Sequence, residues 1–228
     1  MQPTWLVALS WVSLALGVVS FAIVLADTYL RGHRQPVKVM EIVWLVTVLY
    51  VGPAAVRLYW HWGRPEALSP RRREDQPRRP HRGITVTKVS RCGAHCALGF
   101  IVAEVALYAV RFDPAQHPLW ITYAGDYVAA VTIAVLLRVL EGPGRSVARI
   151  WRALTAVVSV ELVTITAFEA ALFAWLTLAH HMIFPEVPLR PDSPTFWFAA
   201  QIGLIAGFIT AWPAASWQVG RGLRAAPH

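Results

Sequence analysis

Six stretches, each with about the 20 apolar residues needed to cross a hydrocarbon layer of roughly 30 Å, divide this sequence. They lie near residues 5–30, 39–60, 92–112, 119–140, 151–178 and 195–217. Unpaired backbone groups are very costly in lipid, so stretches of this kind form helices. The sequence therefore predicts an all-α polytopic membrane protein with six transmembrane helices in a compact bundle.

The composition agrees with a membrane protein. Hydrophobic residues make up 56% of the 228 residues, which is too many for an ordinary soluble domain of this size. The first stretch, Thr4 to Leu30, has no basic lead-in and is longer than a signal-peptide core, so we expect a permanent span. The formal net charge of +8 does not predict nucleic acid as a partner, because the basic residues are concentrated in loops between spans.

The distribution of positive charge predicts the orientation. Segment 61–91 is rich in arginine and proline, and by the positive-inside rule it is a cytoplasmic linker. It separates the first two helices (1–60) from a four-helix core (92–217), and a tail (218–228) follows. Six crossings then place both termini in the cytoplasm, with the chain in the inner (plasma) membrane. The loop from Arg31 to Lys38 conflicts with this topology, because its three positive charges would lie outside.

Four carboxylates inside the predicted spans are the leading candidates for function: Glu104, Asp126, Glu161 and Glu169. An ionised side chain at this depth costs several kcal/mol, roughly 2.5 to 3.5 on insertion scales, unless water, a cation or a partner shares the burden. Together they predict a path for a proton or a metal cation. The alternative is that they are neutral acids that bond to a neighbouring helix, through Thr164, Thr166 or Gln201, and hold the bundle together.

A cysteine motif lies at the cytoplasmic mouth of the third predicted span. Cys92 and Cys96 share a helix face there, and such thiolates suit soft or borderline ions such as Cu(I) or Zn(II), with His95 as a further ligand. His180 is the best placed of the histidines that we expect near the outer side. The alternative is that small residues and cysteines serve close helix packing. We expect no structural disulfide, because the cytosol keeps thiols reduced.

Five segments carry a pattern that is already known: 32–40, 49–53, 90–99, 162–169 and 201–213. Together they resemble an uncharacterised bacterial membrane-protein family, domain-of-unknown-function family 4396, whose signature is close to S-H-C-G-A-G-C-x-L-G-D. The resemblance implies a multi-pass prokaryotic membrane protein without an established activity. This chain has Arg91, His95 and Phe100 where the signature has His, Gly and Asp, so a potential oxygen ligand of a shared metal site is missing.

These observations predict a membrane protein that binds or translocates a cation, either a transition metal such as copper or zinc or a proton. A membrane thiol redox enzyme and a non-catalytic scaffold or assembly subunit are the alternatives. An enzyme is the less favoured reading, since thiols four residues apart on one helix do not close easily into a disulfide. The sequence has no nucleotide-binding loop and no Ser-His-Asp set, so we do not expect ATP-driven transport by this chain alone. The expected partners are the lipid bilayer and a metal ion or proton, and the sequence leaves a homo-oligomer open.

Overall fold

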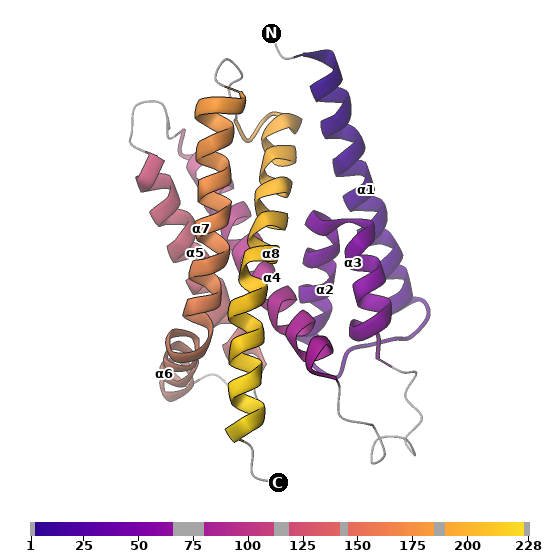
Figure 1. Ribbon diagram of the computed structural model, residues 1–228, viewed down its shortest axis with the longest axis vertical. Coiled ribbons are helices and arrows are strands. Elements are labelled where there is room, and N and C mark those ends of the chain that lie inside the picture. The colour runs from indigo at the N-terminus through magenta and orange to yellow at the C-terminus, as the bar shows by residue number, and fades with distance from the viewer. Residues whose placement is uncertain (1–2, 66–79, 112–118, 142–145, 185–189, 226–228) are drawn as a thin grey trace.

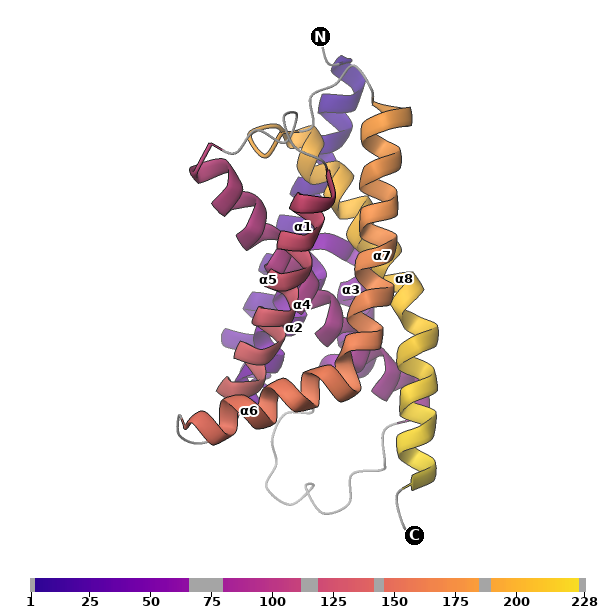
Figure 2. The same cartoon turned by 90° about the vertical axis from the view of Figure 1, so that its left-hand side faces the viewer.

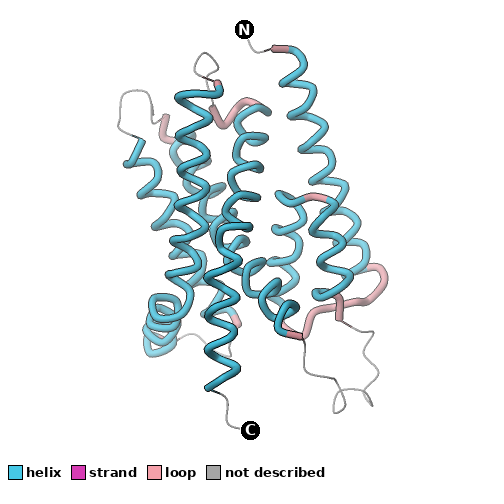
Figure 3. The backbone as a smooth tube through the Cα atoms, in the orientation of Figure 1, coloured by secondary structure: helices cyan, strands magenta, loops and turns pink. Residues whose placement is uncertain are grey.

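The computed structural model describes residues 3–65, 80–111, 119–141, 146–184 and 190–225. Every regular element within these residues is a helix, as Figure 3 shows, which confirms the predicted all-helical class. Five helical segments, not six, are long and apolar enough to cross a membrane. They are α1 (Thr4–Tyr29), α4 (His81–Ala109), α5 (Leu119–Leu140), the run Val147–Ile183 and α8 (Pro194–Ala225).

The predicted second span is a helical hairpin instead of a crossing. Its first arm, α2 (Lys38–Val51), has 14 residues, and at 1.5 Å per residue it reaches about 21 Å, which is too short to cross. Gly52 has a φ of 71° and reverses the chain, and Pro53 begins α3 (Pro53–Leu58), which ends in the π-helical turn η1 (Tyr59–Gly63). Gln35 Nε2 donates to Gly63 O at 2.8 Å, so the two ends of the hairpin lie together.

The hairpin changes the path of the chain through the bundle. Helix α1 runs from one end to the other, the hairpin rises to about mid-height and returns, and four further crossings follow (Figure 1). The first residues of α1 and the last residues of α8 therefore lie at opposite ends (Figure 2). The sequence predicted both termini on one side because segment 39–60 is long enough for a crossing. The path of the chain in the structure does not fit that prediction. The Arg31–Lys38 loop now lies with the start of α4 and the end of α8, at what we call the basic end.

Ion pairs at the basic end fasten the hairpin to α1. Arg64 donates to Asp27 twice, from Nε to Oδ2 at 3.0 Å and from Nη2 to Oδ1 at 2.9 Å. Tyr59 Oη donates to the same carboxylate at 3.1 Å, and Arg34 pairs with Glu41 at 2.7 Å. Both carboxylates are buried. Because buried carboxylates need such partners, these contacts fix where the chain leaves α1 and enters α2.

The fifth predicted span, 151–178, began too early. Helix α6 (Val147–Ala156) lies across the basic end, as Figure 2 shows, and continues through the π-helical turn η4 (Val157–Glu161) into α7 (Leu162–Leu178) and η5 (Ala179–Ile183). A straight helix over these 37 residues would measure about 55 Å, almost twice the hydrocarbon layer. The crossing is therefore made by the part that follows α6.

Close contact between α4 and α5 places their polar residues face to face. A Cβ at Gly99 would meet the backbone N and Cα of Ala130, so the two helices touch backbone to backbone. Small residues allow this approach, and the close packing that results is one source of attraction between helices in lipid. Glu104 follows Gly99 on α4 and Asp126 precedes Ala130 on α5, so both carboxylates lie on the same side of this contact.

Candidate functional site

Three of the four predicted acids form one connected group inside the bundle. Glu104 lies on α4, Asp126 on α5 and Glu169 on α7, and their exposed fractions are 8%, 0% and 1%. Asp126 interacts electrostatically with both of the others. We call these three residues the buried acid group.

The oxygens of Asp126 and Glu169 have no hydrogen-bond partner among the described residues. The side chains that the sequence offered as donors bind other groups instead: Thr164, Thr166 and Gln201. A buried polar group without a hydrogen bond costs free energy, and a buried charge without a partner costs more. A proton, a water molecule or a cation bound at these oxygens would therefore offset the cost of burying them.

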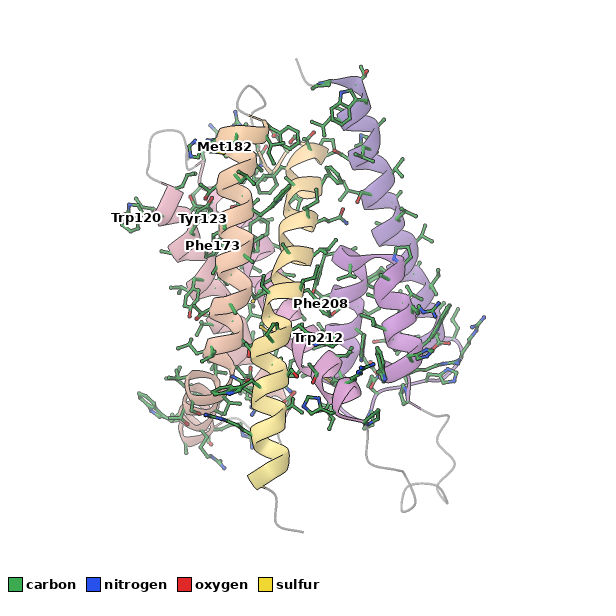
Figure 4. The ribbon with its side chains drawn as sticks, in the orientation of Figure 1. Trp120, Tyr123, Phe173, Met182, Phe208 and Trp212 are labelled. Atoms are coloured by element: carbon green, nitrogen blue, oxygen red, sulfur yellow. The ribbon has the colours of Figure 1, made fainter. Side chains whose placement is uncertain are left out.

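A pair of hydroxyl groups lies beside the acids, on the side away from the basic end. Tyr123 interacts with Asp126 and Glu104, and its hydroxyl shares a hydrogen bond with Thr177 Oγ1 at 3.0 Å. The Tyr123 ring stacks on Phe173, with 4.5 Å between ring centroids. Figure 4 shows the two side chains between α5 and α7. The acids therefore have a polar neighbour on one side and an aromatic wall around it.

The cysteine motif lies on the other side of the acid group, toward the basic end. Cys92 and Cys96 are buried, one turn apart on α4, and interact with each other. Cys96 also interacts with Glu169, although the contact falls short of hydrogen-bond geometry. Tyr50, near the tip of the hairpin, is buried beside both thiols, and its hydroxyl has no partner among the described residues. A Cβ at Gly93 would meet this hydroxyl, so the glycine makes room for it.

Glu161 does not share the situation of the other three acids. Its Oε1 lies 3.2 Å from Arg138 and 3.9 Å from Arg91 Nε, and its Oε2 lies 3.6 Å from His95 Nδ1. Arg91 also pairs with Glu141 at 2.6 Å. Two arginines therefore balance the charge of Glu161. This residue has a structural explanation that the buried acid group lacks.

The structure separates His180 from the cysteine motif. His180 lies on the exposed turn η5, where its ring packs against His181 with 4.8 Å between centroids. Met182 of the same turn lies at the end of the bundle opposite to the basic end (Figure 4). His180 is 19 residues from Glu161, or about 28 Å along a helix. His180 therefore lies too far away to share a metal ion with the cysteine motif, and a separate cation-binding role for it stays a prediction.

No three His, Cys, Asp or Glu side chains within the described part of the chain come together as a metal site. His95 is fully buried and lies beside Glu161, whereas the two cysteines lie beside Tyr50 and Glu169. A copper or zinc ion at the motif stays a prediction, with Cys92, His95 and Cys96 as its remaining protein ligands.

Two features of the site had no clear signal in the sequence. Tyr50 reaches the thiols because the chain reverses at Gly52, and an ordinary span would have placed it elsewhere. A pocket of 340 Å³ also opens beside the motif, lined by Cys92 and Glu161 and by three basic side chains. These are Lys88, Arg91 and Arg138. Basic residues near the ends of spans were used only to predict the orientation, so the sequence did not predict this pocket.

Comparison with known proteins gives one family. The family model described as "Domain of unknown function (DUF4396)" matches residues 84–224, which is more than half of the chain. The match contains the cysteine motif and all three residues of the buried acid group. It begins at residue 84, after the hairpin, whereas the resemblance in the sequence extends back to Gly32. No curated protein and no solved structure matches this chain.

Proposed function

We propose that this chain, which belongs to the DUF4396 family, is an integral membrane protein that passes protons through the buried acid group. One observation carries the proposal: the carboxylate oxygens of Asp126 and Glu169 are buried without a hydrogen-bond donor or a basic partner among the described residues. Carboxylates at membrane depth that lack such partners are typical of proton relays. A carboxylate that gains and loses a proton has a reason to remain without a permanent partner.

The neighbours of the acid group supply the two ends of the path. Toward the basic end, Cys96 and Cys92 connect Glu169 to the pocket beside Glu161. Toward the other end, Asp126 connects to Glu104 and to the hydroxyl of Tyr123. Waters between these groups would complete a relay, since buried polar groups without protein partners are where ordered water binds. In this proposal Glu161 is a paired residue at the inner mouth and does not carry the proton itself.

The proton is favoured over a metal ion by the arrangement of ligands. Transition-metal sites in proteins use at least three protein ligands in most cases, and the described residues offer no such group. A thiol redox enzyme has less support, because Cys96 is completely buried on a continuous helix. A scaffold has less support as well, because acids that join helices would use the hydrogen-bond donors that Asp126 and Glu169 lack.

We further propose that the basic end faces the cytoplasm, with the start of α1 outside. The described residues at this end include twelve Lys or Arg, whereas the described residues at the opposite end include Arg111 and Arg190. The twelve are Arg31, Arg34, Lys38, Arg57, Arg64, Arg82, Lys88, Arg91, Arg138, Arg149, Arg152 and Arg221. Such an excess marks the cytoplasmic side in membrane proteins. The orientation differs from the sequence-based one in the position of the N-terminal end.

Proton flux in liposomes tests the proposal. The purified protein would be reconstituted in vesicles that contain a pH-sensitive dye, and a potassium gradient with valinomycin would drive proton entry. Asp126→Asn and Glu169→Gln keep the shape of each side chain and remove its ionisation, so each should lower the flux at least tenfold. Asp192→Asn, at an exposed acid outside the path, is the matched control and should keep the full flux.

The same preparation distinguishes the alternatives. Equal flux in Asp126→Asn, Glu169→Gln and wild-type protein would contradict the proton route. If the purified protein then also holds copper or zinc that is lost in Cys92→Ser, the metal-binding function replaces it. If the protein binds no metal and the vesicles show no proton flux, the scaffold function is the better explanation.

A further inference from the structure

The pocket beside the cysteine motif has the chemistry of an anion site. It lies between α2, α4, α5 and the start of α7, at the basic end, and has a volume of 340 Å³. Its polar wall carries three basic side chains, Lys88, Arg91 and Arg138, and one acid, Glu161. A volume of this size lies at the small end of the range for ligand pockets in proteins, which is about 300–1,000 Å³.

Two of the basic side chains carry donors without a hydrogen bond to the described residues. Arg91 is fixed by its contact with Glu141, but its Nε and Nη2 are buried and have no hydrogen-bond partner among the described residues. Lys88 is half-buried on the same helix, one turn before Arg91 and Cys92, and interacts electrostatically with Glu161 without forming an ion pair within 4.0 Å among the described residues. Buried donors without partners are rare in folded proteins, so this arrangement favours a bound acceptor.

The net charge of the side chains around the pocket indicates the charge of its ligand. The three basic side chains carry three positive charges, and Glu161 and Glu141 offset two of them. One positive charge remains, which suits an acceptor with a single negative charge. Met40, Ile84 and Val160 form an apolar wall in the same pocket, which suits a ligand with an apolar part.

We propose that this pocket binds a singly charged oxyanion group, phosphodiester or carboxylate, that is attached to an apolar chain. A phospholipid headgroup and a soluble organic acid both carry such a group. Arginine and lysine in this arrangement bind oxyanions through charge-assisted hydrogen bonds. The pocket opens at the inner mouth of the proposed proton route and shares Cys92 with it, but none of its three basic residues belongs to the buried acid group.

Chemical labelling of the two lysines tests the site in the unaltered protein. Lys38 and Lys88 are the only lysines of the chain, and Lys38 is exposed at the start of α2. The detergent-purified protein would be acylated briefly with an amine-reactive ester, and peptide mass spectrometry would follow each lysine. The probes are short-chain phosphatidylglycerol for the lipid source and hexanoate for the soluble source. Dihexanoylglycerol and hexanol are their uncharged controls.

The expected result is protection of Lys88 alone. At least one anionic probe should slow acylation of Lys88 severalfold and leave Lys38 unchanged, whereas the uncharged controls should protect neither. Protection by phosphatidylglycerol only assigns the site to a lipid, and protection by hexanoate assigns it to a soluble acid. If neither probe protects Lys88, or if the uncharged controls protect it equally, the proposal is overturned.

Binding to variants provides the second measurement. The shift of the thermal unfolding midpoint with probe concentration gives the dissociation constant. Lys88→Gln should weaken binding about tenfold, as expected for the loss of one charge-assisted hydrogen bond in a half-buried site. Lys38→Gln removes the same charge from the surface and should bind as the wild type does. Equal affinity in Lys88→Gln and the wild type overturns the site without affecting the proton route, since this assay measures no flux.

Discussion

Replacing Arg64 by glutamine should loosen the hairpin from α1 and lower the stability of the whole protein. Arg64 donates two hydrogen bonds to Asp27, whose side chain is only 2% exposed. Breaking a buried ion pair by removing one partner costs about 3–5 kcal/mol. The Arg64 side chain is 35% exposed, so solvent screens part of the interaction, and Tyr59 still donates to Asp27. We therefore expect a loss of about 2 kcal/mol.

A double-mutant cycle measures this interaction directly. The free energy of unfolding would be determined by denaturation in detergent for the wild type, Arg64→Gln, Asp27→Asn and the double variant. Residues in contact show coupling energies of about 0.5–3 kcal/mol, and we expect a value near the middle of this range. Arg31→Gln is the control, because Arg31 is 70% exposed and lies 3.7 Å from the same carboxylate, so its loss should cost less than about 1 kcal/mol. A coupling energy near zero, or equal effects of Arg31→Gln and Arg64→Gln, would refute the reasoning.

Two further predictions test the path of the chain and its packing. A cysteine placed at Pro36, in the loop between α1 and α2, should react with an impermeant maleimide in inverted vesicles, whereas one placed at Ser193 should react in intact cells. Reaction of both from one side would contradict the hairpin. Gly99→Ala should destabilise the protein by about 1–3 kcal/mol, because the new methyl group meets the Ala130 backbone. Gly125→Ala, where a Cβ has nothing within 4 Å, should be neutral or stabilising by up to about 1 kcal/mol, and a similar effect of the two variants would be inconsistent with this packing.

The helical class could be predicted from the sequence because hydrophobic length is a direct physical requirement of the bilayer. The number of crossings could not. Segment 39–60 has the length of a span, and the Gly52-Pro53 pair has the same appearance whether it bends a helix or reverses it. The conflict of charge in the Arg31–Lys38 loop was the one local sign of reversal. The hairpin removes this conflict, since it places that loop at the basic end.

Part of the candidate site could also be predicted, for a similar reason. A carboxylate in an apolar stretch is visible in the sequence, and three of the four predicted acids do form one group. Their partners are not visible, because an arginine near a span end has the same appearance whether it turns outward or inward. Arg138 turns inward to Glu161. Tyr50 was missed because its position depends on the reversal at Gly52.

The described acids within the helical bundle divide by depth into two kinds, and this division explains what the sequence could not separate. Near the basic end, Asp27, Glu41, Glu141 and Glu161 each have an arginine within 4.0 Å. Deeper in the bundle, Asp126 and Glu169 have neither a basic partner nor a hydrogen bond among the described residues. Asp27 and Glu41 are buried as Asp126 and Glu169 are, so burial alone does not identify a functional acid. The difference lies in the partner: an arginine balances the charge of the first kind of acid and joins it to a neighbouring segment, whereas an acid of the second kind needs a proton, water or a cation to offset the cost of its burial.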